Sequence, residues 1–121
     1  MEQQRVYNLE ERTFLFAKDC RMLMKKLPRT IEVIEDGKQL VRSSGSVGAN
    51  YIEANESLSK KDFYYRIKIC RKEAKESNYW LSLLKVCNQE FEGEISILIQ
   101  EATELKKIFS SILEKAPLTP S

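Results

Sequence analysis

Apolar residues recur along this chain at the spacing of an α-helix. Between residues 9 and 27 they stand three, four or seven positions apart, at Leu9, Phe16, Cys20, Leu23 and Leu27. This spacing brings them to one face of a helix, so the segment is predicted to be helical and amphipathic. Pro28 cannot continue a helix interior, and Thr30 is suited to cap the next element.

The same periodicity predicts three further helices, at residues 30–56, 60–87 and 91–114. The second has a weak middle, because Gly37 and the serine- and glycine-rich run 43–48 are poor helix formers. Those small residues would let another helix approach closely, although a turn or hinge at Gly37 is an open alternative. Ser59 is a suitable N-cap for the third helix.

Four amphipathic segments joined by short links predict an all-α fold, an antiparallel up-down-up-down four-helix bundle. No stretch alternates with period two for long enough to form a strand. With 121 residues the chain is long enough for one domain, which we expect to span residues 1–121. The proline-containing end, residues 117–121, is expected to be a loose tail.

Composition argues against a membrane-spanning or secreted protein and against a disulfide-linked or zinc-binding one. No apolar run reaches the roughly 18 residues of a membrane span, and residues 1–5 lack the apolar stretch of a signal peptide. We therefore expect a cytoplasmic protein with no membrane partner. The three cysteines form no C-x-x-C pair and the chain has no histidine, which favours thiols packed as small apolar groups over disulfides or a zinc site.

Candidate catalytic chemistry is sparse, because the lack of histidine removes the commonest general base and most transition-metal sites. One acidic pattern remains: Glu53 and Glu56 on the second helix, and Glu73 and Glu76 on the third. All-α nucleotide pyrophosphatases hold Mg²⁺ with a similar E-x-x-E and E-x-x-D arrangement. Here glutamate replaces the closing aspartate, and two lysines flank the second pair. We expect no enzyme, metal or cofactor, with a Mg²⁺-dependent nucleotide pyrophosphohydrolase as a lesser alternative.

Positive charge is concentrated in residues 58–87, with eight lysines and arginines against three acids. Opposite the predicted core of this helix, basic and polar side chains follow steps of three and four. From Lys61 to Lys75 they extend over roughly 21 Å, enough to span several backbone phosphates, and Tyr64 is placed to stack on a base. An ordinary solvated helix face is the alternative interpretation. The predicted nucleic-acid-binding residues are Lys61, Tyr64, Lys68, Arg71, Lys72, Lys75 and Lys85.

A second apolar strip runs beside the core stripe of the same helix, at Tyr65, Ile69, Trp80 and Leu83. A wide core accounts for part of such an excess. The remainder predicts a subunit interface, where tyrosine and tryptophan are favoured, and therefore a homo-oligomer.

Residues 35–56, together with 59–63 and 66–77, resemble the four-helix bundle proteins encoded by intervening sequences in bacterial large-subunit ribosomal RNA genes. This family is also labelled an S23 ribosomal protein family, and the resemblance extends over roughly residues 7–115. The family signature Asn-Ile-x-Glu-Gly stands here as Asn50-Tyr51-Ile52-Glu53-Ala54. The alanine in place of glycine marks a variant of the pattern.

The resemblance implies an antiparallel bundle that assembles as a barrel-like homopentamer and brings no catalytic residues. A similar protein, the accessory variability factor of diversity-generating retroelements, implies a reverse-transcriptase-like partner and nucleic-acid binding through a basic surface. Two functions are thus in competition. One is a non-enzymatic oligomeric accessory protein that binds RNA or DNA, and the other is a protein-interaction scaffold whose charges serve solubility.

Overall fold

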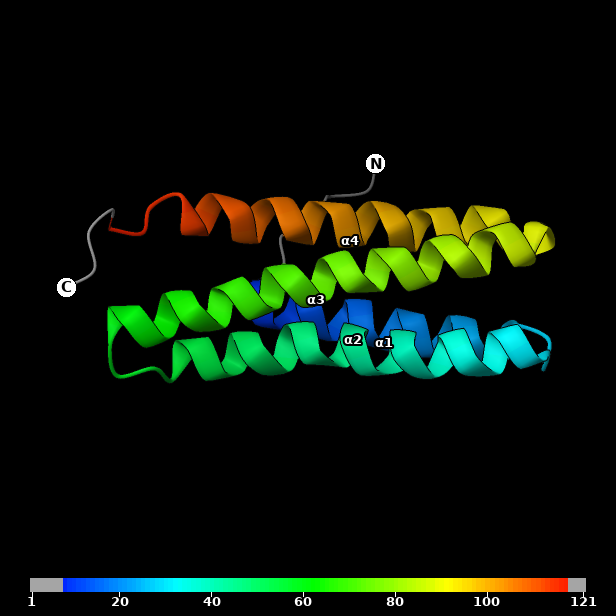
Figure 1. The fold of residues 1–121 in the computed structure, drawn as a ribbon, viewed down its shortest axis with the longest axis horizontal. Coiled ribbons are helices and arrows are strands. Elements are labelled where there is room, and N and C mark those ends of the chain that lie inside the picture. The colour runs from blue at the N-terminus through cyan, green and yellow to red at the C-terminus, as the bar shows by residue number, and fades with distance from the viewer. Residues whose placement is uncertain (1–7, 118–121) are drawn as a thin grey trace, which may run out of the picture.

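The computed structural model describes residues 8–117, which fold into four long α-helices that run alternately up and down one axis (Figure 1). The predicted all-α antiparallel four-helix fold is confirmed. None of the helices in this range is long and apolar enough to cross a membrane. The helices are α1 (Leu9–Lys26), α2 (Ile31–Asn55), α3 (Lys60–Cys87) and α4 (Glu92–Leu113), and a 3₁₀ turn (Gln89–Phe91) precedes α4.

Side-chain caps fix where the first three helices begin. The side-chain oxygens of Asn8, Thr30 and Ser59 each accept a hydrogen bond from the backbone amide three residues later, at 2.8, 3.2 and 3.1 Å. Helix α2 continues through Gly37 without a turn, so the alternative of a hinge there is not realised. The expected loose tail lies outside the described residues, apart from Pro117.

The core takes about one residue per turn from each helix, with Phe16, Leu40, Ile67 and Phe109 among its fully or almost fully buried side chains. Two of the thiols belong to it. Burial raises the pKa of Cys20 and Cys70 to about 12, so both thiols stay protonated at neutral pH. Cys87 is exposed at the end of α3, so the interpretation of all three cysteines as core residues is wrong for this one.

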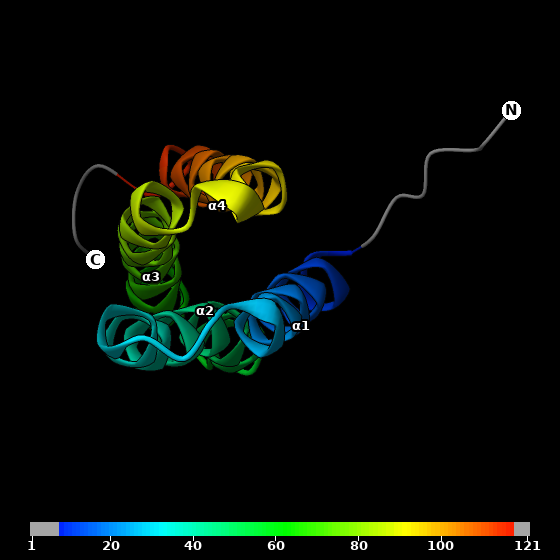
Figure 2. The same cartoon turned by 90° about the vertical axis from the view of Figure 1, so that its right-hand side faces the viewer.

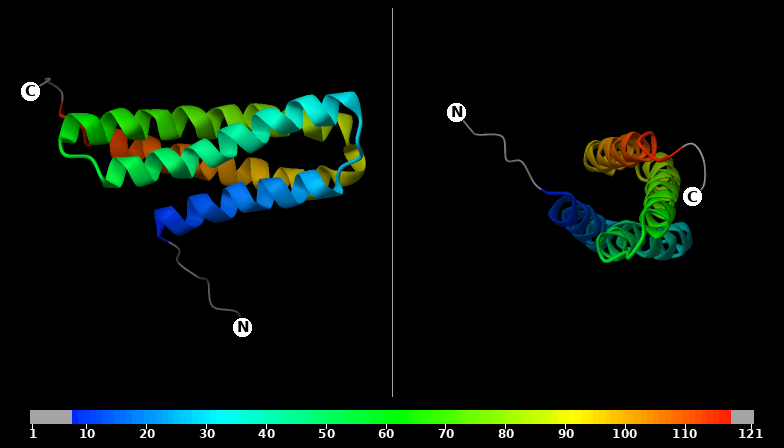
Figure 3. Two further views of the ribbon diagram at one scale, coloured as in Figure 1. Left: turned by 90° about the horizontal axis from the view of Figure 1, so that it is seen from below. Right: turned by 90° about the vertical axis from the view of Figure 1, so that its left-hand side faces the viewer.

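Seen end-on, the helices form an open arc in chain order, with α2 and α3 in the middle and α1 and α4 at the ends (Figure 2). The opposite end shows the same opening (Figure 3). A buried hydrogen bond between the Ser43 and Ser77 hydroxyls, 2.8 Å long, joins α2 to α3. Ion pairs bridge α1 and α4, one of them between Arg12 and Glu101 at 2.7 Å.

Close contact between α1 and α2 depends on Gly48, which has no side chain. A Cβ atom added at Gly48 would lie 3.0 Å from Thr13 Oγ1 and 3.3 Å from Thr13 Cβ. Thr13 is fully buried, and its hydroxyl donates to the carbonyls of Leu9 and Glu10, so it has no room to withdraw. Here the small residues of α2 allow the close approach that the sequence predicts.

Two glycine substitutions test this contact. Alanine is favoured over glycine in a helix by about 1 kcal/mol, and a Cβ at Gly93 would meet nothing within 4 Å. We expect Gly93→Ala to leave Tm unchanged or raise it, while Gly48→Ala pushes α1 away from α2 and lowers Tm by about 4 °C. Thermal unfolding followed by circular dichroism measures both. Equal stability of the two variants would contradict the packing argument.

Candidate nucleic-acid interface

Most of the predicted basic residues lie together where α3 and α4 meet at the surface. A hollow of about 350 Å³ is lined there by Lys68, Arg71, Lys72, Lys75, Lys106 and Ser110. We call the five cations of this set the basic seam. Four of them are predicted from the sequence, whereas Lys106 comes from α4. Lys61 and Lys85, near the two ends of α3, do not line the hollow.

The seam is poorly neutralised within the chain. Among the ion pairs of residues 8–117, Lys72 is the one seam cation with a carboxylate partner, and its Nζ lies 3.7 Å from Glu73 Oε2. Lys68, Lys72 and Lys75 are exposed, so their ammonium groups can reach a ligand without first leaving a buried site. The arrangement therefore favours binding of an anion that carries several charges.

Most of this charge stays uncancelled, because two of the three acids of α3 are paired with α2. Arg42 of α2 forms ion pairs with both Glu73, at 3.4 Å, and Glu76. Glu73 is only 6% exposed, so Arg42 balances a charge that is nearly buried. One side of α3 thus carries its paired carboxylates and another carries the seam.

Tyr64, predicted to stack on a base, has contacts within the chain, and its stacking role stays a prediction. Its ring packs edge-on against Phe63 with centroids 5.2 Å apart, and its hydroxyl donates to the carbonyl of Lys115 at 3.4 Å. Asn78, further along α3, donates to Thr103 of α4 at 3.1 Å. The stripe is turned toward α4, so its inner members lie at the junction between the helices, and Tyr64 is half-buried there whereas Tyr65 is exposed.

The four glutamates considered as a Mg²⁺ site do not converge. Glu53 and Glu56 are exposed at the end of α2, whereas Glu73 and Glu76 lie in the middle of α3 beside Arg42. Within the described part of the chain, no group of three or more His, Cys, Asp and Glu side chains is placed to hold a metal ion.

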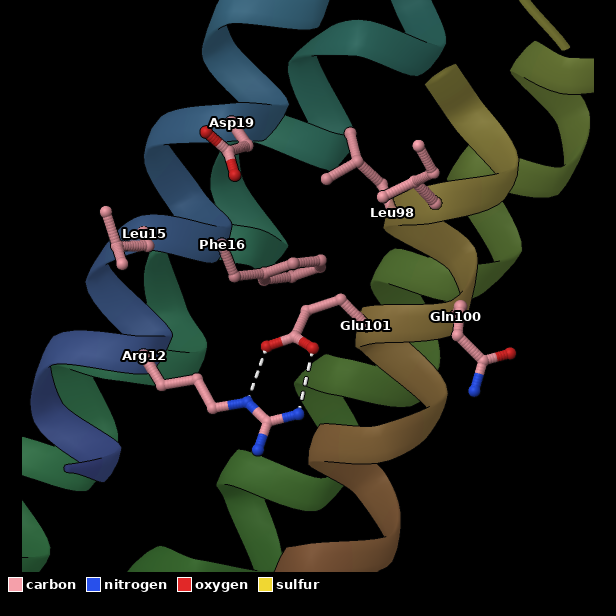
Figure 4. Close-up of a pocket in the computed structure, with 8 residues that line it drawn as sticks. Arg12, Leu15, Phe16, Asp19, Leu98, Gln100 and Glu101 are labelled. Carbon is pink, nitrogen blue, oxygen red and sulfur yellow. Dashed lines mark hydrogen bonds and ion pairs between the residues drawn. The ribbon is translucent and has the colours of Figure 1, made fainter. Parts of the chain in front are cut away.

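A second hollow, of about 470 Å³, opens between α1 and α4 (Figure 4). Leu15, Phe16 and Leu98 give it apolar walls. At its edge Arg12 donates two hydrogen bonds to Glu101, at 2.7 and 2.9 Å, and this bonding raises the pKa of the Arg12 guanidinium. Because these two charges satisfy each other, what the groove offers a partner is largely apolar contact.

The four residues predicted as a subunit interface do not form one exposed patch. Trp80 packs against the core, and Ile69 and Leu83 are half-buried, which fits the alternative of a wide core. Tyr65 is exposed. The interface itself stays a prediction.

Comparison with known proteins agrees with the resemblance drawn from the sequence. Residues 5–111 match the family model described as the 23S rRNA-intervening sequence protein. A crystal structure of a protein with unknown function from the S23 ribosomal protein family of Bacteroides thetaiotaomicron VPI-5482 has a TM-score of 0.78 and 28% sequence identity, covering 89% of this chain and 100% of that one. No curated protein matches the chain. The similarity to the accessory variability factor stays a prediction.

The ion pairs of Arg42 generate a prediction about stability. Arg42→Met leaves Glu73 nearly buried without its main partner, and we expect it to lower the free energy of unfolding by about 1–3 kcal/mol. Arg42→Met/Glu73→Met removes both charges and should cost less than Arg42→Met alone. Urea unfolding of these two variants and of the single variant Glu73→Met measures the differences. A double variant whose loss equals the sum of the two single losses would show that the pair is not coupled.

Proposed function

This chain belongs to the 23S rRNA-intervening sequence protein family, and on that premise we propose that it is a non-enzymatic accessory protein that binds RNA or DNA through the basic seam. One observation carries the proposal. Five cations from two helices surround a single hollow, and one of them has an acidic partner among the described residues. A phosphate backbone has the charge and the repeat to meet such a surface.

The expected binding mode follows from the chemistry of these cations. Lysine ammonium groups bind phosphate as point charges and do not read the bases, so binding is weakly selective for sequence. Affinity comes mainly from the release of counterions, and each neutralised phosphate adds roughly 0.7–0.9 to the slope of log affinity against log salt. One seam of five cations then binds weakly at physiological salt.

Oligomerisation would compensate for weak binding by one seam, because several copies joined together raise the avidity for one strand. Apolar side chains on α1 and α4 support a homo-oligomer, since Phe14 is 68% and Ile97 is 70% exposed. We expect five subunits, the number that the family resemblance implies.

A protein-interaction scaffold is the second candidate function. The apolar groove between α1 and α4 favours it, because a reverse-transcriptase-like partner would dock there.

Charge reversal tests the basic seam. Lys68→Glu/Arg71→Glu/Lys75→Glu should weaken binding to an RNA oligonucleotide at least tenfold, because it replaces three phosphate contacts with repulsion. The matched control, Lys18→Glu/Lys25→Glu/Arg29→Glu, changes the net charge equally at exposed positions on α1 and just beyond its end, and should keep most of the affinity. Filter binding at two salt concentrations compares them.

If the two triple variants lose equal affinity for the RNA oligonucleotide, binding depends on the net charge of the protein rather than on the basic seam. No binding by the wild type at low salt would contradict the proposed function and leave the scaffold as the remaining candidate.

Self-association generates a separate prediction. Light scattering at micromolar concentration should give a mass several times the 14.1 kDa of one chain. If the exposed apolar side chains of α1 and α4 form the contact, Phe14→Glu/Ile97→Glu lowers that mass. If the strip on α3 forms it, Ile69→Glu/Leu83→Glu lowers the mass instead. A wild-type protein that runs as a monomer would contradict the oligomer and the avidity argument together.

A further inference from the structure

The outermost ridge of α3 combines lysines with tyrosines. Its members follow steps of four and three residues, which places them in one row along the helix. All are exposed, the two tyrosines by 60% and 58% of their surface. We call this row the outer ridge, and it consists of Lys61, Tyr65, Lys68, Lys72, Lys75 and Tyr79.

Packing within the chain does not account for these two tyrosines. Neither hydroxyl takes part in a hydrogen bond within residues 8–117, in contrast to that of Tyr64, which donates to the carbonyl of Lys115 just beyond α4. Tyr79 contacts Trp80 edge-on, with ring centroids 5.0 Å apart, and this contact orients its ring without covering it. Two large rings are therefore held at the surface, and the three cations Lys68, Lys72 and Lys75 lie between them.

We propose that the outer ridge is a platform for single-stranded nucleic acid, on which bases stack against Tyr65 and Tyr79 while the lysines between them hold the backbone. The inference rests on the proposed function and names the substrate class of the same surface. The two tyrosines are fourteen positions apart, roughly 21 Å along the helix at about 1.5 Å per residue. A strand bound at both rings thus passes Lys68, Lys72 and Lys75 on the way.

The rings provide the discrimination between single and double strands. Bases in a duplex are already stacked on their neighbours, so a duplex can use the lysines but not the tyrosines. Unpaired bases present open faces, and stacking on an aromatic side chain strengthens the binding of single strands whatever their sequence. Single-stranded RNA or DNA gains from both kinds of contact.

A second copy of this chain is a poorer occupant of the ridge. Lysines are depleted from the buried centres of protein interfaces, and here three of them stand between the tyrosines. Covering the ridge with protein would bury these ammonium groups, and the described structure offers Glu73 as the one nearby ion-pair partner, for Lys72. A single-stranded polyanion satisfies the cations and the rings together.

The test uses the full chain and two variants that differ only in the ring. Binding is measured by fluorescence anisotropy to a uridine oligonucleotide of about 12 nucleotides, within the site sizes of single-strand binders, and to an RNA duplex of equal length. We expect Tyr65→Ala/Tyr79→Ala to weaken single-strand binding about 30-fold and duplex binding less than threefold. Tyr65→Phe/Tyr79→Phe keeps both rings and should bind both ligands like the wild type.

Other outcomes of these binding measurements would overturn the stacking platform. An alanine variant that binds both ligands like the wild type, or loses equal affinity for both, overturns the stacking platform and leaves the basic seam intact. A phenylalanine variant as weak as the alanine variant also overturns it. A fall in oligomer mass for the alanine variant, measured by light scattering, assigns the ridge to a subunit contact instead. Failure of the wild type to bind either ligand removes the proposed function itself.

Discussion

The ion pairs that Arg42 makes with Glu73 and Glu76 determine how charge is distributed around α3. This helix carries three acids and eight cations between residues 58 and 87, and mixing them on one face would cancel much of its field. Arg42 instead holds two of the acids against α2. The cost of keeping Glu73 almost buried is offset by its guanidinium partner. The same contact therefore joins the two central helices and leaves the outer side of α3 positive.

The open arc of the helices has a second consequence for the surface. Helices α2 and α3 share the most extensive contact, while two ion pairs bridge α1 and α4 beside an apolar groove. The groove and the basic seam lie on opposite sides of α4, because Glu101 points to α1 and Lys106 to α3. One helix thus separates an apolar surface suited to protein contact from a charged surface suited to phosphate. An oligomer formed through the first would leave the second free for nucleic acid.

Local rules were enough to predict the helices and the core, because caps such as Ser59 and apolar steps such as that from Phe16 to Cys20 act within a few residues. The site was harder to predict, since neighbouring helix positions differ by about 100° in direction. Tyr64 and Tyr65 are adjacent in sequence, yet the first packs toward α4 and the second faces outward. Lys106 was missed because its role depends on which side of α4 meets α3, and no periodicity within one helix carries that information.

The central claim is that cations from two helices act on one nucleic-acid backbone, and salt titration of the single variant Lys106→Gln tests it most directly. Lys106 contributes the cation from α4, and its removal leaves every residue of α3 in place. We expect the slope of log affinity against log salt for single-stranded RNA to become shallower by roughly 0.7, the share of one phosphate contact. An unchanged slope in this variant would show that α4 takes no part in binding, and would contradict the basic seam.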